Sequence, residues 1–248
     1  MIRALFIAAV VAMSIVIAVI AVFPQDDLTV ASWFWTPADG FWLGQHGAAA
    51  FLRRISMWPT IVIGIAALVS LIQHILLPAS RQFMSARAAA FLFLTLLAAP
   101  VLLVNGILKE HWERARPVHV TELGGSWRFT PWWQPGDGRQ CVTNCSFVSG
   151  EASGAAWLAA PALLAPPPAR LPLLAAVAGY TAVVSGLRIA FGGHFLSDTL
   201  IAILLTLLII AFAYRWFYRR PQAPTEADFA ARLGRLGAPL RRVVGGRP

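Results

Sequence analysis

The chain has 248 residues, of which 58% are hydrophobic and only 12% are charged. A soluble domain of this length cannot bury so much apolar surface, so we expect the lipid bilayer to be its solvent. The formal net charge of +9 does not indicate nucleic-acid binding, because the arginines lie between apolar runs and are densest after the last one, a pattern typical of a cytoplasmic membrane surface.

Six apolar runs are long enough, or nearly so, to cross a membrane as helices of about 20 residues. They cover roughly 4–23, 57–77, 88–108, 150–167, 172–191 and 195–218. The first run is too long for the core of a cleaved signal peptide, so we expect it to remain as a span. The fourth is the weakest, because it is short and ends in three prolines. We predict an all-α, polytopic membrane protein with a six-helix domain, 1–218, and a basic cytoplasmic tail, 219–248.

The placement of the basic residues predicts the orientation, since cytoplasmic span ends carry an excess of arginine and lysine. We expect a bacterial inner-membrane protein with both termini in the cytoplasm. Most of the arginines then fall on the cytoplasmic side: Arg3, Arg81, Arg87, Arg170, Arg215, Arg219, Arg220, Arg232, Arg235, Arg241, Arg242 and Arg247. The periplasmic side receives the only lysine and the remaining arginines: Lys109, Arg114, Arg116, Arg128, Arg139 and Arg188, and also Arg53 and Arg54, for which nothing in the sequence accounts.

Segment 24–55 carries Trp33, Trp35 and Trp42, aromatic residues that favour the membrane interface. A Thr36-Pro37 pair is typical of a helix start, so we predict a short interfacial helix on the periplasmic surface, with ordinary loop packing as the alternative. In the tail, Thr225 and a carboxylate three residues later resemble a capping box. A basic amphipathic helix on anionic lipid or a disordered tail would both fit 219–248.

Two cysteines, Cys141 and Cys145, fall in the second periplasmic loop, where oxidation can occur. Two thiols alone cannot complete a structural zinc site. We expect a disulfide between them, with free thiols as the alternative.

A cluster of charged residues stands at the outer end of the third apolar run. Lys109 and Arg116 are seven residues apart, so on one helix both would face the same way until Pro117 ends it. Lysine supplies a point charge and arginine a planar fork for phosphate oxygens. The pair predicts an anion clamp, whereas either residue alone would indicate an anchor at the membrane surface.

A second cluster opens the fourth run. Ser149 is placed to cap a helix, and Gly150 would let an anion approach the free backbone N–H groups there. Glu151 would lie beside that anion, where a carboxyl group is useful as a proton donor. The alternative is that Glu151 is an ion-pair partner of Arg116 or Arg188.

The third cluster joins the last two runs and contains Arg188, His194 and Asp198. His194 and Asp198 are four residues apart, so we expect them to share a helix face. An aspartate that accepts one imidazole N–H leaves the other ring nitrogen free to attack. All three clusters fall at one depth on one side of the membrane, where ionisable groups predict a functional site.

Together the clusters resemble the signature of the type-2 phosphatidate phosphatase superfamily, which includes bacterial lipid phosphatases. That signature is Lys, six residues and Arg-Pro, then Pro-Ser-Gly-His, then Ser-Arg, five residues, His, three residues and Asp. The resemblance covers roughly residues 57–215, and the residues that match in spacing are Lys109, Arg116, Pro117, Ser149, Gly150, Arg188, His194 and Asp198.

The resemblance implies an enzyme that works without a metal or other cofactor and forms a phosphohistidine. It implies that His194 is the nucleophile and that Asp198 is its orienting partner. The residues implied to bind the substrate phosphate are Lys109, Arg116, Ser149, Gly150 and Arg188. The implied partner is a phosphorylated membrane lipid.

The chain departs from the signature in three places. Val148 replaces Pro, Leu187 replaces Ser, and Glu151 replaces the second His, which the family uses as the general acid. Burial would let Glu151 hold a proton, while nearby cations favour its carboxylate. A good leaving group tolerates a weak acid, and the second motif is similar to that of bacterial lipid A phosphatases, so we favour the 1- or 4'-phosphate of lipid A.

Other functions remain open at this point. The alternative substrates are undecaprenyl pyrophosphate, phosphatidylglycerol phosphate and phosphatidate. A lipid phosphotransferase would pass the phosphoryl group to a second lipid instead of water. A non-catalytic lipid-phosphate binder would keep the cations, but it would have no need for an oriented imidazole.

Overall fold

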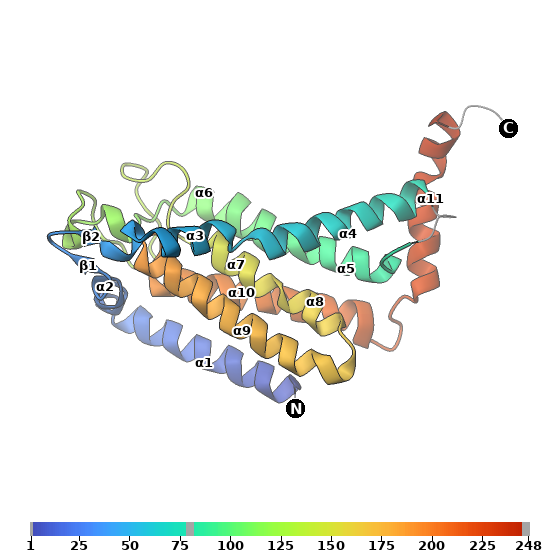
Figure 1. Cartoon of the computed structure of the whole chain (residues 1–248), viewed down its shortest axis with the longest axis horizontal. Helices are drawn as coiled ribbons and strands as arrows, with labels where there is room; N and C mark the ends of the chain where they lie inside the picture. The colour runs from blue at the N-terminus through green and yellow to red at the C-terminus, as the bar shows by residue number, and fades with distance from the viewer. Residues whose placement is uncertain (1, 78–81, 245–248) are drawn as a thin grey trace.

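The computed structural model describes residues 2–77 and 82–244 as an elongated bundle of long helices (Figure 1). Among these residues, five helical stretches are long and apolar enough to cross a membrane: Ile2–Val22, Gly47–Leu76, Ala86–His111, Pro167–Ala190 and Leu196–Arg219. Their outward faces carry large apolar side chains, such as Val22 at 69% and Phe212 at 74% exposure. Apolar surface of this extent marks a surface that meets lipid, so the chain is a membrane protein.

Several of these stretches are composite. The first is α1 (Ile2–Val22), and the second joins α3 (Gly47–Ile55) to α4 (Trp58–Leu76). The third joins α5 (Ala86–Leu96), the π-helical segment η2 (Leu97–Leu108) and α6 (Lys109–His111). The last two are α9 (Pro167–Ala190), and α10 (Leu196–Tyr214) with η5 (Arg215–Arg219). Pro100 lies inside η2, where its missing N–H prevents regular α-helical bonding.

The fourth expected span, 150–167, is divided into α7 (Gly150–Trp157) and α8 (Ala159–Leu164). The helix is interrupted at Leu158, because Pro161 has no N–H to donate to the carbonyl of Trp157. Most of the side chains of α7 are buried, and the helix contacts η2, α9 and α10. This run is therefore apolar because it packs against protein, and neither piece reaches the length of about 20 residues that spans a bilayer.

Polar side chains fix α7 within the bundle. The hydrogen bonds join Thr60 to the Gly154 carbonyl at 2.8 Å, Ser153 to Thr206 at 2.7 Å, and Trp157 to Thr95 at 3.0 Å. Each pair satisfies groups that would be costly to bury alone, so the position of α7 along its neighbours is well defined.

One end of the bundle is covered by the segment between α1 and α4. It contains α2 (Gln25–Ser32), a hairpin of β1 (Trp35–Thr36) and β2 (Gly40–Phe41), η1 (Trp42–Gln45) and α3. The predicted helix start at Thr36-Pro37 is wrong, because these residues enter the hairpin turn. The hydroxyl of Thr36 accepts from the backbone N–H of Asp39 at 3.0 Å, a local bond that competes with helix formation.

The opposite end carries α11 (Glu226–Val244), as Figure 1 shows. The capping box at its start is confirmed: Thr225 N donates to Asp228 Oδ2 at 2.8 Å, and Asp228 N donates to Thr225 Oγ1 at 3.2 Å. The carboxylate of Glu226 accepts from the backbone N–H groups of Ala86 at 2.5 Å and Arg87 at 3.1 Å. The described part of the tail is therefore a helix joined to the start of α5.

Candidate active site

His194 lies in the turn between α9 and α10 and is only 1% exposed. Its Nδ1 is 2.6 Å from the carbonyl oxygen of Ser146. Because a carbonyl can only accept, the neutral ring carries its proton on Nδ1 and leaves Nε2 unprotonated. An unprotonated imidazole nitrogen is a nucleophile, so this arrangement prepares Nε2 for attack.

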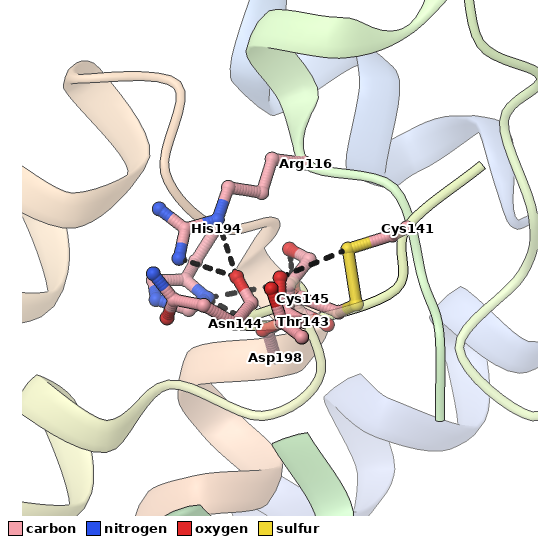
Figure 2. The surroundings of a disulfide bond; sticks show 8 residues. Arg116, Cys141, Thr143, Asn144, Cys145, His194 and Asp198 are labelled. Carbon is pink, nitrogen blue, oxygen red and sulfur yellow. Dashed lines mark hydrogen bonds and ion pairs between the residues drawn. A yellow bond between two sulfur atoms is a disulfide. The ribbon is translucent and has the colours of Figure 1, made fainter. Parts of the chain in front are cut away.

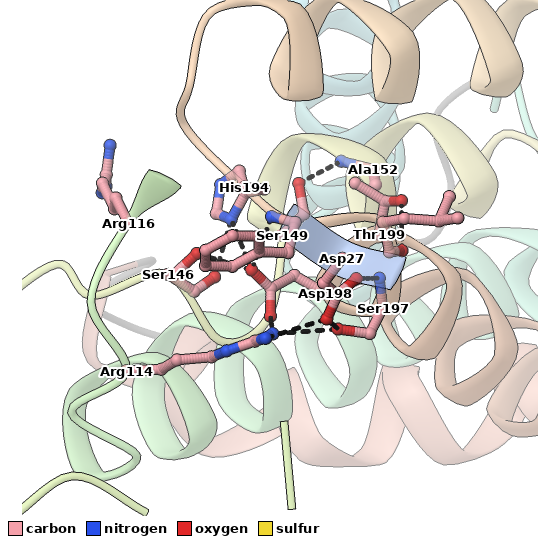
Figure 3. A network of polar contacts seen from close by, with 12 residues as sticks. Asp27, Arg114, Arg116, Ser146, Ser149, Ala152, His194, Ser197, Asp198 and Thr199 are labelled. Carbon is pink, nitrogen blue, oxygen red and sulfur yellow. Dashed lines mark hydrogen bonds and ion pairs between the residues drawn. The ribbon is translucent and has the colours of Figure 1, made fainter. Parts of the chain in front are cut away.

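Asp198 is fully buried in the first turn of α10, beneath His194 (Figure 3). Its carboxylate accepts from Ser146 Oγ and Arg114 Nη1, each at 2.5 Å, and from Phe195 N at 2.9 Å. The nearest approach to the ring, between Asp198 Oδ2 and His194 Nδ1, is 3.9 Å. The imidazole hydrogen bond expected of Asp198 is thus made by the Ser146 carbonyl, and Asp198 holds the hydroxyl of that same serine.

The prediction that His194 and Asp198 share a helix face is also wrong. α10 begins at Leu196, so His194 precedes the helix and only Asp198 lies on it. Gly192, at a φ of 63°, makes the turn that leads out of α9, and a Cβ there would meet the ring of Phe41. Glycine is therefore needed at this position to bring His194 over the start of α10.

Lys109 and Arg116 do not share a helix, so the prediction of one common helix face is wrong. The helix ends with α6, and Glu113 has a φ of 56°, a left-handed conformation in which a helix cannot continue. Arg116 follows in extended chain. Both cations, together with Arg188, nevertheless interact electrostatically with His194.

A small disulfide loop holds Arg116 (Figure 2). The sulfurs of Cys141 and Cys145 are bonded, and the two Cα atoms are 5.8 Å apart. Asn144 within this loop has a φ of 53°, and its carbonyl accepts from Arg116 Nε at 3.1 Å and Nη2 at 2.7 Å. Two of the five guanidinium N–H groups are used in this way, so the loop fixes the direction of Arg116.

A surface hollow of about 390 Å³ lies between Arg116 and this loop. Its wall includes the rings of His119 and Trp127, whose centroids are 4.5 Å apart. The remaining lining residues are Val118, Cys141, Val142, Thr143 and Asn144. Arg116 is the one candidate phosphate-binding residue in the lining of this hollow.

Ser149 and Gly150 lie where α7 begins. Ser149 Oγ accepts from Ala152 N at 3.3 Å, so the expected helix cap is present. Ser149 N donates to the Asp198 carbonyl at 3.2 Å, which joins this helix start to the first turn of α10. A Cβ on Gly150 would lie 2.5 Å from Asn105 Oδ1, so glycine permits the close approach of η2 and α7.

Glu151 follows and lies between two arginines. Its Oε1 is 3.4 Å from Arg188 Nη1 and 3.6 Å from Arg53 Nη2. The guanidinium of Arg53 also stands 5.7 Å from the centroid of the Phe191 ring. Sequence reasoning missed Arg53. The one indication in the sequence was that Arg53 falls on the predicted periplasmic side, where arginines are disfavoured. In the structure, α3 brings Arg53 to the site.

The electrostatics of the site favour an anion. Burial lowers the pKa of His194 well below its usual 6.5, and three cations lower it further, so the ring is neutral at neutral pH. Burial and then Arg53 lower the pKa of Arg116. Three cations, Arg188, Arg116 and Lys109, act on the ring, and Arg53 in turn acts on Arg116 and Arg188. The carboxylates of Glu151 and Asp198 offset part of this charge. A phosphate dianion would relieve this excess of positive charge.

The described residues include no group of three or more His, Cys, Asp or Glu side chains placed to hold a metal ion. Comparison with known proteins identifies the family. The sequence profile of the PAP2 superfamily matches residues 87–222, which is more than half of the chain. The chain belongs to the PAP2 superfamily.

Relatives with the printed name lipid A 4'-phosphatase support this membership. One from Francisella tularensis subsp. novicida is 31% identical over 212 residues, which cover 81% of this chain and 90% of the relative. One from Rhizobium leguminosarum is 42% identical over 118 residues, which cover 47% of this chain and 49% of the relative. One from Rhizobium etli is 44% identical over 117 residues, 47% of this chain and 44% of the relative. The chain thus spans about half the length of the two Rhizobium proteins. No solved structure matches it.

The PAP2 superfamily match includes most of the side chains that gather around the imidazole: Lys109, Arg116, Ser149, Gly150, Glu151, Arg188, His194 and Asp198. Arg53 in α3 precedes the matched region, and so does the whole of α2. The N-terminal segment of this PAP2 protein therefore adds charged groups to a site whose other residues lie in the family region.

Proposed function

We propose that this protein is a membrane lipid phosphatase that removes the 4'-phosphate of lipid A, with His194 as the nucleophile. The observation that carries the proposal is the state of the imidazole. Its Nδ1 is bound to a carbonyl, which leaves Nε2 unprotonated in a ring on which three cations act. The choice of lipid rests on the three relatives, each of which is named lipid A 4'-phosphatase.

In the proposed first step, Nε2 of His194 attacks phosphorus and the bond from phosphorus to the sugar oxygen breaks. The proton stays on Nδ1, where it is donated to the Ser146 carbonyl oxygen, and the nearby Asp198 carboxylate stabilises the positive charge that the ring acquires. The phosphoryl oxygens are held by Lys109, Arg116 and Arg188 and by the start of α7 at Ser149 and Gly150. Positioning and charge neutralisation supply most of the rate in phosphoryl transfer.

Glu151 is the proposed proton donor to the departing sugar oxygen. Its Oε1 faces the two arginines, whereas its Oε2 is buried and, within the described chain, has no hydrogen-bond partner. Oε2 is therefore the oxygen to which we assign the transferred proton. Water then attacks phosphorus and gives a proton to the Glu151 carboxylate, while the bond from phosphorus to Nε2 breaks. This step frees inorganic phosphate and restores both the neutral ring and the protonated Glu151. The test is the pH–rate profile of Glu151→Gln and Glu151→His. Full activity of the Gln variant at every pH would show that Glu151 is not the acid.

We further propose six crossings, with the site at the periplasmic face of the inner membrane and both termini in the cytoplasm. α7 and α8 follow one another along the bundle from the site toward the start of α9, so the chain passes between the two ends there although the pair is shorter than α9 (Figure 1). The end opposite the site carries arginines of η5 and α11, which suits a cytoplasmic tail over 219–248. Alkaline phosphatase fused after Arg139 should be active and, fused after Arg220, inactive; the reverse pattern would overturn this orientation.

Phosphate release from a panel of purified lipids tests the activity. The panel is lipid A, undecaprenyl pyrophosphate, phosphatidylglycerol phosphate and phosphatidate, with mass spectrometry to locate the phosphate that remains on lipid A. We expect loss of the 4'-phosphate, abolished by His194→Ala and unchanged by His111→Ala. His111 is an exposed histidine of α6 whose Nδ1 lies 2.8 Å from the Ile107 carbonyl of the preceding turn. An active His194→Ala variant would refute the mechanism, and binding without release would indicate a lipid-phosphate binder.

A further inference from the structure

A buried ionic network lies beneath the candidate site and includes a residue of α2 (Figure 3). Asp27, Arg114 and Asp198 are each at most 1% exposed. Arg114 Nη2 donates to Asp27 Oδ2 at 2.8 Å, and Arg114 Nη1 donates to Asp198 Oδ1 at 2.5 Å. One guanidinium thus bridges two carboxylates that come from helices far apart in the sequence.

Arg114 is held on every side. Its Nε donates to the Thr130 carbonyl at 3.0 Å, and its guanidinium carbon lies 4.4 Å from the centroid of the Phe195 ring. Asp27 in turn holds Ser197, accepting from its backbone N–H at 2.9 Å and its hydroxyl at 2.5 Å. The two oxygens of Asp27 therefore fix both the arginine and the first turn of α10.

The contacts form a continuous path to the nucleophile. Asp27 holds Arg114, Arg114 holds Asp198, and Asp198 accepts the hydroxyl of Ser146. The carbonyl of that same serine binds Nδ1 of His194. Every link is a hydrogen bond between buried groups, so a change in Asp27 is transmitted to the ring through atoms with little room to readjust.

Stability alone is a weak reason for such a network. Removing charges from solvent costs much of what their attraction returns, so a buried ionic network is weak evidence for a role in stability. The network also lies where geometry is needed, because the orientation of His194 depends on Ser146 and Asp198.

We propose that Asp27 and Arg114 are positioning residues for the phosphatase reaction, which fix Asp198 and the start of α10 and thereby the orientation of the His194 ring. Asp27 does so from outside the region that matches the PAP2 superfamily, so this chain uses its N-terminal segment to support the site. The inference rests on the proposed roles of His194 and Asp198.

The test compares Asp27→Asn with Asp26→Asn, which removes the neighbouring carboxylate of the same helix. The amide keeps the shape of Asp27 but turns one acceptor into a donor that faces Arg114 or Ser197. We expect kcat to fall about tenfold to hundredfold, as for the loss of a charge-assisted hydrogen bond, with KM within about twofold, because Asp27 does not touch the lipid. The rate of phosphohistidine formation in an alkaline quench should fall by the same factor, and Asp26→Asn should alter neither constant.

Each outcome decides the inference. If Asp27→Asn keeps the wild-type kcat, or lowers only the melting temperature, Asp27 is a structural anchor and the inference is overturned. If that variant does not fold, Ser197→Ala replaces it, since it removes only the hydroxyl between Asp27 and Arg114. It should lower kcat about threefold to tenfold, and an unchanged kcat would overturn the inference equally. Failure of the proposed function is seen separately, as wild-type protein without phosphate release or an active His194→Ala variant.

Discussion

Opening the disulfide between Cys141 and Cys145 should weaken phosphate binding through Arg116. The loop that the disulfide closes presents the Asn144 carbonyl, which accepts two N–H groups of that arginine at 3.1 and 2.7 Å. Asn144 is also held in a left-handed conformation with a φ of 53°, which asparagine tolerates but an open chain does not maintain. Reduction removes the covalent constraint on this conformation and leaves the side chain of Arg116 in place, so it tests position and not charge.

The magnitude follows from two terms. The bonded cysteines are four residues apart, and closing so short a loop restricts the open chain by about 2 kcal/mol. Hydrogen bonds to a charged group contribute about 1.5–3 kcal/mol, and part of this is regained when Arg116 binds water or substrate in the open state. We therefore expect kcat/KM to fall about tenfold, mostly through a higher KM, since the loss of about 1.4 kcal/mol in binding corresponds to that factor.

The assay measures phosphate release from lipid A with and without dithiothreitol. The matched control is the double variant Cys141→Ser with Cys145→Ser, which should have the lowered activity and show no response to the reductant. Reoxidation of the wild-type protein should restore its activity. The reasoning is refuted if the reduced wild type and the double variant both keep the wild-type kcat/KM, because Arg116 would then be positioned without the loop.

Two further predictions concern the cations next to the ring. Gly193→Ala would place a Cβ 2.5 Å from Nη2 of Arg188, so it should displace the guanidinium and lower kcat/KM about tenfold. Gly186→Ala is the control, because a Cβ there meets nothing within 4 Å and kcat/KM should not change. Equal kcat/KM values for the two variants would contradict this prediction. Because burial, followed by Arg188 and other cations, lowers the pKa of His194, kcat/KM should stay level as the pH falls to about 6.5 and decline only below it. Arg188→Met removes one of these cations, so its pH profile on the same lipid should decline at a higher pH than that of the wild type.

Local patterns predicted much of the architecture. Five of the six apolar runs are long helices, and the caps at Ser149 and Thr225 are present, because spans and caps depend on residues close together in the chain. The fourth run, predicted as the weakest span, is divided into two short helices, α7 and α8, and the proline at 161 accounts for the break.

Features that depend on tertiary contacts could not be predicted in this way. Spacing indicated that Lys109 and Arg116 share a helix face, but the helix ends before Arg116. Both residues still interact electrostatically with His194, because the loop after α6 turns Arg116 back toward the ring. The i, i+4 spacing of His194 and Asp198 predicted a direct hydrogen bond, whereas Ser146, distant in sequence, makes it. Arg53 and Asp27, which contact the site residues Glu151 and Arg114, lie on short helices that no periodic pattern in the sequence predicted.

Glu151 and Arg53 make best sense as a pair. The family signature has a histidine at position 151, and two arginines beside a histidine would disfavour its protonated form, which a general acid needs. The same cations stabilise the ionised carboxylate of Glu151 by ion pairing, so they account for a glutamate at this position and not for its protonation. Glu151→His should therefore be a poor acid near neutral pH, and adding Arg53→Ala should improve it. Arg53 is 42% exposed, so the gain is about 1 kcal/mol, or about fivefold in kcat.

The double variant is compared with Glu151→His, and Arg54→Ala in the same background serves as the control, since that arginine is the exposed neighbour of Arg53 on α3. The comparison separates two explanations of the departure from the family pattern. If Arg53→Ala raises kcat in the histidine background and lowers it in the wild type, the charge of α3 and the carboxylate are adapted to each other. If it lowers kcat equally in both, Arg53 acts on the phosphate directly, and the acid at position 151 is independent of it.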